Sequence, residues 1–251
     1  MRLGADPEVF LINRSGDFVS SVGKIPGTKE QPHHISGMPP GFTVQQDNVA
    51  LEFGIPPAAN AKQFAEHIAS VLAGARRHIL PKGLSYATAA SCVSFPKSQL
   101  NTAEANIFGC EPDFNAWTGK ENPRPEAKNK NLRSCGGHLH VETQLDRIQV
   151  VRAMDVFLGL PSLFEDVSGS KRRELYGMPG AYRPKPYGVE YRTLSNYWVF
   201  SPGDCQAMFW RTQQALDFVM ERGLLEDERV PTAIRTSNVE LAAQLMQEYG
   251  V

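Results

Sequence analysis

Alternating apolar and polar residues mark several short stretches of the chain, and this period of two predicts β-strands. The clearest stretch runs from residue 44 to 54, where Val49, Leu51 and Phe53 are separated by polar or small residues. Similar patterns predict further strands at residues 3–13, 18–22, 84–95, 136–142 and 189–194.

Apolar residues three and four positions apart predict four helices. The first begins at Asn60, an N-cap residue with Gln63 three positions later, and its apolar stripe ends at Ile79. The other three are expected to begin at Asp146, Ser201 and Ser237. Strands and helices are interspersed, and the link between residues 3–13 and 18–22 is hairpin-like. We therefore expect an α+β fold with a mixed, largely antiparallel sheet.

Charge and composition exclude several kinds of partner. The chain has 26 Lys and Arg against 27 Asp and Glu, a formal net charge of −1, so no general basic field would hold nucleic acid. Hydrophobic residues make up 41% of the chain, but no run approaches the roughly 18 residues of a membrane span. Acidic residues at positions 6 and 8 interrupt any signal-like apolar segment, so we expect a cytoplasmic protein.

The four cysteines are far apart in the sequence and form no CxxC pair, so we expect buried free thiols and no disulfide framework. They are Cys92, Cys110, Cys135 and Cys205. A catalytic thiol is the alternative for Cys135, which directly precedes two glycines.

Acidic and imidazole side chains recur at alternate positions in the predicted strands. The pairs are Asp6 with Glu8, His138 with His140, and Glu190 with Arg192. Residues i and i+2 of a strand point to the same face, so each pair lies on one side of its strand. If the strands join one sheet, so much charge on one face would require neutralisation by metal ions and an anionic ligand.

The predicted strand 44–54 adds two further acids, Asp47 and Glu52. On a regular strand the side chains of Asp47 and Glu52 would point to opposite faces. Asp47 therefore needs a bulge, or a position at the strand's start, to join the other acids. An oxygen-rich set of this kind favours Mg²⁺ or Mn²⁺, with imidazole as a minority ligand. The spacing of His138 and His140 is also compatible with zinc.

Basic residues gather between positions 166 and 188, in a segment punctuated by glycines. They include Arg172, Arg173, Arg183 and Lys185. Guanidinium groups bind phosphate or carboxylate in a bidentate manner, and a magnesium-bound nucleotide would link these cations to the nearby acid Glu190. The chain has no Walker-type or strand-linked dinucleotide-binding glycine motif, and a solvated basic loop is the alternative interpretation.

Five motifs in this order resemble those of the phage-type carboxylate–amine ligases, or amidoligases, over roughly residues 3 to 200. They are Gly4-Ala5-Asp6-Pro7-Glu8-Val9-Phe10, Asp47-Asn48-Val49-Ala50-Leu51-Glu52-Phe53, Gly109-Cys110-Glu111-Pro112-Asp113-Phe114, Gly136-Gly137-His138-Leu139-His140 and Gly188-Val189-Glu190-Tyr191-Arg192. These ligases are distant relatives of glutamine synthetase and glutamate–cysteine ligase.

The resemblance implies one glutamine-synthetase-like catalytic domain over residues 1–251, with an antiparallel sheet shaped as a funnel. Helices would pack on its outer face, with residues 202–250 supplying the C-terminal ones. It also implies ATP-dependent joining of a small-molecule or peptide carboxylate to an amine through an acyl phosphate, with ATP and Mg²⁺ or Mn²⁺ as cofactors.

The resemblance also assigns roles to individual residues. The metal-binding positions would be Asp6, Glu8, Asp47, Glu52, His138 and Glu190. The phosphate-contacting positions would be Arg172, Arg173, Arg183, Lys185 and Arg192. Glu52, Glu190 and Arg192 would take part directly in catalysis, with a carboxylate accepting the proton of the amine.

Two other functions fit parts of this pattern. A zinc hydrolase would hold its ion through His138 and His140 and use Glu52 or Glu190 as general base. A binding or virion-associated protein would keep the fold without turnover. Substrate selectivity is expected in the loop 118–133 and in the loop that carries His33-His34, because loops on a rigid scaffold usually set it.

Overall fold

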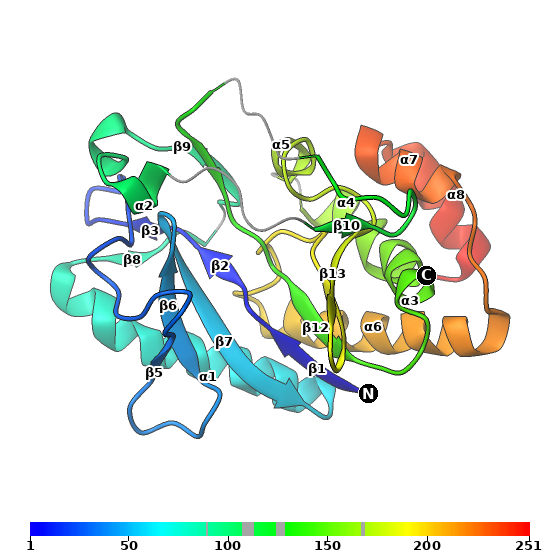
Figure 1. The fold of residues 1–251 in the computed structure, drawn as a ribbon, viewed down its shortest axis with the longest axis horizontal. Coiled ribbons are helices and arrows are strands. Elements are labelled where there is room, and N and C mark those ends of the chain that lie inside the picture. The colour runs from blue at the N-terminus through cyan, green and yellow to red at the C-terminus, as the bar shows by residue number, and fades with distance from the viewer. Residues whose placement is uncertain (89, 107–112, 124–128, 167–168) are drawn as a thin grey trace.

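The computed structural model describes residues 1–251 except 89, 107–112, 124–128 and 167–168. Its centre is an antiparallel sheet in the order β10-β13-β14-β12-β1-β7-β6-β5, with β2 also paired to β7 (Figure 1). These strands are β1 (Arg2–Ala5), β2 (Glu8–Val9), β5 (His33–His34), β6 (Thr43–Asp47), β7 (Ala50–Ala58), β10 (Phe114–Asn115), β12 (Leu139–Glu142), β13 (Ala181–Lys185) and β14 (Gly188–Tyr191).

Two small sheets accompany the large one. The first pairs β3 (Leu11–Ile12) with β4 (Phe18–Val19) and β8 (Ser85–Tyr86). The second pairs β9 (Cys92–Ser94) with β11 (Leu132–Ser134). The expected strand 84–95 is therefore two separate strands, β8 and β9, in different sheets.

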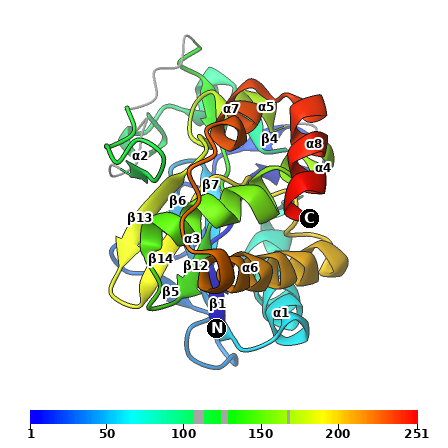
Figure 2. The same cartoon turned by 90° about the vertical axis from the view of Figure 1, so that its right-hand side faces the viewer.

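Helices cover one face of the large sheet (Figure 2). α1 (Ala61–Ile79) packs on β7, α3 (Arg147–Met154) packs on β14, and α6 (Pro202–Arg222) packs on both helices. The remaining helical segments are α2 (Ala103–Asn106), α4 (Ser162–Glu165), α5 (Ser170–Arg173), α7 (Arg229–Thr236), α8 (Val239–Tyr249), two 3₁₀ turns at Leu80–Lys82 and Lys97–Gln99, and a π-helical turn at Asp155–Gly159. The α+β class with a large antiparallel sheet is confirmed. None of the helices in the described ranges is long and apolar enough to cross a bilayer.

Three of the four expected helix starts are confirmed by their caps. The side chains of Asn60, Asp146 and Ser201 each accept a hydrogen bond from the backbone N–H three residues later. The fourth start was misplaced by one residue. Ser237 ends α7 with a positive φ of 50°, and Asn238 caps α8 instead. α7 itself was not expected.

The expected strand 3–13 is wrong as a single element. The chain forms β1, leaves the ladder at Asp6-Pro7, and forms β2 and then β3 in a different sheet. Proline has no backbone N–H to give to a ladder, which accounts for a break at this position. Asp6 and Glu8 therefore belong to separate strand segments, and their side chains reach different groups of residues.

The expected strand 44–54 is also wrong, because it is a hairpin. β6 ends at Asp47, the chain reverses at Asn48 and Val49, and β7 begins at Ala50. Asn48 has a φ of 55°, a left-handed conformation that asparagine tolerates better than most residues. The reversal places Asp47 on the same face as Gln45, which lies opposite Glu52, so no bulge is needed to bring the two acids together.

Candidate functional site

The functional side chains lie on the face of the sheet opposite the helices. In β12 the apolar residues Leu139 and Val141 are fully buried in the core beneath, so His138 and His140 point the other way. In β14 the same alternation turns Tyr191 toward α3 and Glu190 toward the histidines. The alternation expected from the sequence is thus confirmed for these two strands.

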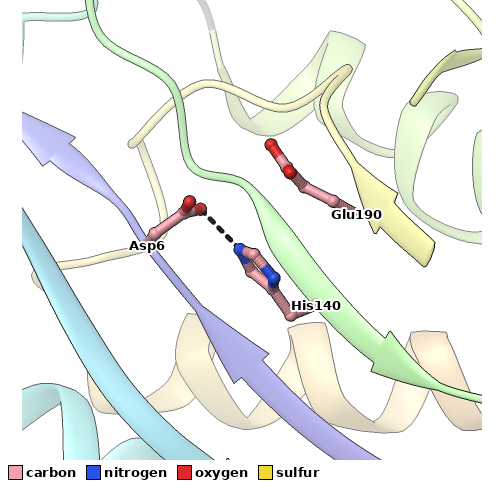
Figure 3. Close-up of side chains that lie close together, drawn as sticks. All are labelled: Asp6, His140 and Glu190. Carbon is pink, nitrogen blue, oxygen red and sulfur yellow. Dashed lines mark ion pairs between the residues drawn. The ribbon is translucent and has the colours of Figure 1, made fainter. Parts of the chain in front are cut away.

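A first group of possible metal ligands consists of Asp6, His140 and Glu190, contributed by three neighbouring segments of the sheet (Figure 3). Their closest ligand atoms all lie within 4.8 Å of one another. Backbone register explains the meeting, because His140 stands between Gly4 and Glu190 across the ladder. The Oδ1 atom of Asp6 lies 3.0 Å from Nε2 of His140.

Cations already surround Glu190 in this first group. The Nζ atom of Lys185 lies 2.7 Å from its Oε2, Nη1 of Arg183 lies 3.6 Å from its Oε1, and Arg192 also bonds to Oε1. Glu190 is only 1% exposed. Burial and the charge of Asp6 act to raise its pKa, but Arg192 and the two histidines outweigh them and lower the pKa to about 2.

His138 sits beside this group without completing it. Its Nδ1 lies 3.5 Å from Oδ1 of Asp6 and 3.3 Å from Nη1 of Arg192. Burial, followed by the charge of Arg192, lowers the pKa of His138 to about 4. For His140, burial acts to lower the pKa but the Asp6 charge outweighs it and raises the pKa. His140 therefore belongs to the first group, and the expected ligand His138 adjoins it, with its Nδ1 also 3.9 Å from Oε1 of Glu190.

A second group contains Glu8, Asp47 and Glu52, and its closest oxygens also lie within 4.8 Å of one another. Glu8 in β2 stands directly opposite Glu52 in β7, and the Asn48 turn brings Asp47 alongside them. A backbone N–H from Gly136 donates to Glu8 at 2.8 Å, and Gln45 donates to Glu52 at 2.9 Å.

The electrostatics of the second group differ from those of the first. Burial, followed by the charge of Asp47, raises the pKa of Glu8 to about 7. Burial and the charges of Asp6, Asp47 and Glu8 raise the pKa of Glu52 well above its ordinary value. No salt bridge within the described residues joins any of these three carboxylates to a Lys or Arg side chain. Their mutual repulsion is what a bound divalent cation would relieve.

A cavity of about 540 Å³ opens beside the second group. Its wall includes Glu8, Asp47, His138, Arg172 and Arg192. Asp6, Glu52 and Glu190 do not line it, although each adjoins a residue that does. The volume falls in the range of small-molecule sites in proteins, which is about 300–1,000 Å³.

The expected phosphate-binding residues fall into three sets. Arg172 and Arg192 line the cavity and are 2% and 7% exposed. Arg183 and Lys185 hold Glu190 and are not part of the cavity wall. Arg173 lies elsewhere, because its Nη1 approaches Asp166 at 3.9 Å and its Nε donates to Ser237. The structure does not bring Arg173 to the cavity.

Several cavity residues were not expected. Thr28, Lys29 and Glu30 come from the segment that precedes β5, and the expected loop residues His33 and His34 form that strand. Arg133 and Tyr176 also line the wall. Arg133 donates to the side chain of Asn48 and to the backbone carbonyl of Ala105, a fold-dependent placement that no local sequence pattern signals.

Two alternatives find little geometric support. Neither ligand group in the described part of the chain contains both His138 and His140, although each histidine approaches Oδ1 of Asp6. Cys135 is fully buried, and burial raises its thiol pKa well above the ordinary value, so it is not an activated nucleophile. Cys92, Cys135 and Cys205 are free thiols, and Cys110 lies outside the described residues.

Comparison with known proteins adds one finding to this geometry. The family model described as phage phiEco32-like COOH.NH2 ligase-type 2 matches residues 128–221. The matched segment contains His138, Arg172, Glu190 and Arg192, whereas Glu8, Asp47 and Glu52 precede it. No curated protein matches the chain. The match supports the resemblance carried by the sequence motifs: residues 128–221 are similar to the carboxylate–amine ligases of this family.

Proposed function

We propose that this protein is an ATP-dependent ligase that joins a carboxylate to an amine through an acyl phosphate. The observation that carries the proposal is a group of three neighbouring carboxylates, two of which line one cavity together with two buried arginines. That arrangement suits a polyanion that arrives with a divalent cation. The name of the matching family supplies the reaction class.

The donor set of the second group fits Mg²⁺ or Mn²⁺, since all three ligands are carboxylates. Glu8 and Asp47 line the cavity, and Glu52 lies opposite Glu8 across the β2–β7 ladder. A cation bound there would neutralise phosphate oxygens and polarise the group that is transferred. The first group fits a cation less well, because Lys185, Arg183 and Arg192 already compensate Glu190.

Arg172 and Arg192 are the proposed anion-binding residues. The backbone carbonyls of Thr193 and Arg192 hold two nitrogens of the Arg172 guanidinium at 2.7 and 3.2 Å. Arg192 in turn donates to Asp113 at 3.2 Å and to Glu190. Both guanidinium groups are therefore fixed before a ligand arrives, which is the arrangement that stabilises charge in a transition state.

The position of Glu190 changes one part of the expected mechanism. A carboxylate with a pKa of about 2 is a weak proton acceptor near pH 7. We therefore propose that Glu190 orients Arg192, Arg183 and Lys185, and that it does not deprotonate the amine. We further propose that the antiparallel sheet and its loops form a glutamine-synthetase-like funnel within one catalytic domain.

The test is ADP release that depends on both substrates together. Purified protein is incubated with ATP and Mg²⁺ and screened against paired carboxylates and amines, and any amide product is identified by mass spectrometry. The proposal predicts ADP in excess of background only when both substrates are present. Absence of ADP across amino acids, peptides and polyamines would contradict it.

A matched pair of variants gives this assay its control. Asp47→Asn removes one charge from the cavity wall and is expected to abolish ADP release. Asp17→Asn replaces an exposed acid in the turn before β4 and is expected to leave it unchanged. Equal loss in both variants would indicate a nonspecific effect and count against the cation site.

A further inference from the structure

The carboxylate of Asp155 lies on the helix side of the sheet, away from the cavity, and is completely buried. It is the first residue of the π-helical turn Asp155–Gly159 that continues α3. Turns of this kind are rare and frequently occur at functional positions. Burying a carboxylate destabilises the folded protein unless hydrogen bonds to its oxygens compensate for the lost water. The hydrogen-bond partners of Asp155 therefore indicate its role.

The hydrogen bonds of Asp155 come from both flanks of Arg192. The hydroxyl of Tyr191 donates to Oδ1 at 2.7 Å, and that of Thr193 lies 3.3 Å from the same oxygen. Tyr191 is the last residue of β14. Anchoring Tyr191 and Thr193 on Asp155 therefore fixes the backbone on both sides of Arg192, whose side chain lines the cavity.

The same carboxylate is connected to the second cavity arginine. The backbone carbonyl of Thr193 accepts the 2.7 Å hydrogen bond from Nη1 of Arg172. A shift of Thr193 would therefore displace Arg172 as well as Arg192. The Cβ of any residue larger than glycine at position 177 would lie 2.4 Å from Nη1 of Arg172, so the guanidinium has little room to adjust.

A third contact reaches the segment that carries Asp113. The indole N–H of Trp117 donates to Oδ2 of Asp155 at 2.6 Å, and the backbone N–H of Gly180 also bonds to Asp155. Asp113, four residues before Trp117, accepts from Nε of Arg192. The Asp155 carboxylate therefore links residues 191–193, which carry Arg192, to residues 113–117, which include its partner Asp113.

The Tyr191 hydroxyl, the Trp117 indole N–H and the Gly180 backbone N–H all donate to Asp155, which explains why an acid occupies the position. The Thr193 hydroxyl is shared, because it also lies 3.0 Å from the carbonyl of Met178. A carboxylate accepts at both oxygens, whereas an asparagine would present an NH₂ group to one of the donors. Asp155→Asn would preserve the side-chain volume while breaking one side of this network. The substitution is therefore a specific probe of what the network does.

We propose that Asp155 is a positioning residue, which fixes Arg192 and Arg172 in the orientation that binds the anionic ligand. The inference about ligand binding rests on the proposed function, whereas the inference about Arg192 rests on the contacts alone. Two separate measurements distinguish them.

The first measurement follows Arg192 without any ligand. Its Nε–H signal in a ¹H–¹⁵N NMR spectrum is assigned by its absence from Arg192→Lys. Asp155→Asn is expected to shift or broaden this signal. Asp166→Asn is the matched control, since Asp166 is also a buried acid but accepts from Ser195, and it is expected to leave the signal in place. An unchanged Arg192 signal in folded Asp155→Asn would overturn the inference.

The second measurement is the affinity for Mg²⁺-ADP by titration calorimetry. Asp155→Asn is expected to weaken binding by about tenfold, the effect of losing one well-aimed charged hydrogen bond. In the double variant with Arg192→Lys, the two losses should not multiply, because both act through the same guanidinium. Losses that multiply independently would show that Asp155 is only structural.

The remaining outcomes are also decisive. If Asp155→Asn does not fold, Tyr191→Phe removes a single hydroxyl from the network, and it should shift the same Arg192 signal; no shift would overturn the inference. If the Arg192 signal moves but the wild-type protein binds no nucleotide, the positioning role is supported and the proposed function fails.

Discussion

Glu8→Gln should make the cation-free protein more stable at alkaline pH, although it removes a residue of the proposed active site. Glu8 stands against Glu52 and Asp47, and burial followed by the charge of Asp47 raises its pKa from 4.5 to about 7. Glutamine has nearly the same shape and keeps an oxygen to accept the 2.8 Å hydrogen bond from Gly136. The substitution therefore removes charge with little change in packing.

The size of the effect follows from the shift in pKa. One pKa unit corresponds to 1.36 kcal/mol, so a rise from 4.5 to about 7 gives about 3 kcal/mol. A raised pKa in the folded state means that the folded protein binds the proton more tightly than the unfolded chain does. The stabilisation of the folded protein by protonated Glu8 is therefore complete below about pH 4.5, and it is lost as the pH rises through about 7. Glutamine does not ionise and avoids this loss.

The assay is thermal unfolding with a chelator present, at pH 5 and at pH 8.5. The two proteins should unfold at similar temperatures at pH 5. At pH 8.5 the variant should unfold higher by roughly 6–12 °C, since each kcal/mol moves the midpoint of a chain of this size by about 2–4 °C. Excess Mg²⁺ should raise the midpoint of the wild type more than that of the variant.

Glu66→Gln serves as the control, because Glu66 is an exposed acid of α1 whose partner is Lys62 at 3.8 Å. It should change the midpoint little at either pH. A Glu8→Gln variant whose advantage does not grow with pH, or that is less stable than wild type at pH 8.5, would refute the raised pKa of Glu8, and with it the buried, uncompensated charge on which the cation site depends.

Three further substitutions test other parts of the site. Gly136→Ala would place a Cβ 2.2 Å from Nε2 of His138, so the imidazole must move, and the initial rate of ADP release should fall at least about tenfold. Arg172→Lys should weaken Mg²⁺-ADP binding about tenfold by calorimetry, whereas Arg173→Lys should leave it unchanged; equal effects would contradict the placement of these neighbours. Asn48→Val forces a β-branched residue to a φ of 55° and should cost about 1–3 kcal/mol of unfolding free energy in urea titrations, and a neutral result would show that the turn is not required.

The sequence allowed the exposed and buried faces of the central strands to be predicted. Leu139 and Val141 had to enter the core, and this alone places His138 and His140 on the opposite face. Helix starts were also predictable, because a capping side chain such as Asn60 bonds to a backbone N–H only three residues later.

What the sequence did not reveal depends on backbone reversals and on distant partners. The hairpin at Asn48 was hidden inside an uninterrupted alternating pattern, and it is this turn that joins Asp47 to Glu8 and Glu52. Arg172 and Arg173 are adjacent in the sequence, yet only the first faces the cavity, because the short helix α5 sends the two side chains in different directions. Such choices are set by tertiary packing.

The most direct test of the account is Mn²⁺ binding followed by electron paramagnetic resonance, which needs no knowledge of the substrates. The wild-type protein should bind Mn²⁺, Mg²⁺ should compete for the site, and Glu8→Gln or Glu52→Gln should weaken binding strongly while Glu66→Gln should not. Failure of the wild type to bind the ion, or equal binding by all four proteins, would contradict the claim that three strand segments assemble a divalent-cation site.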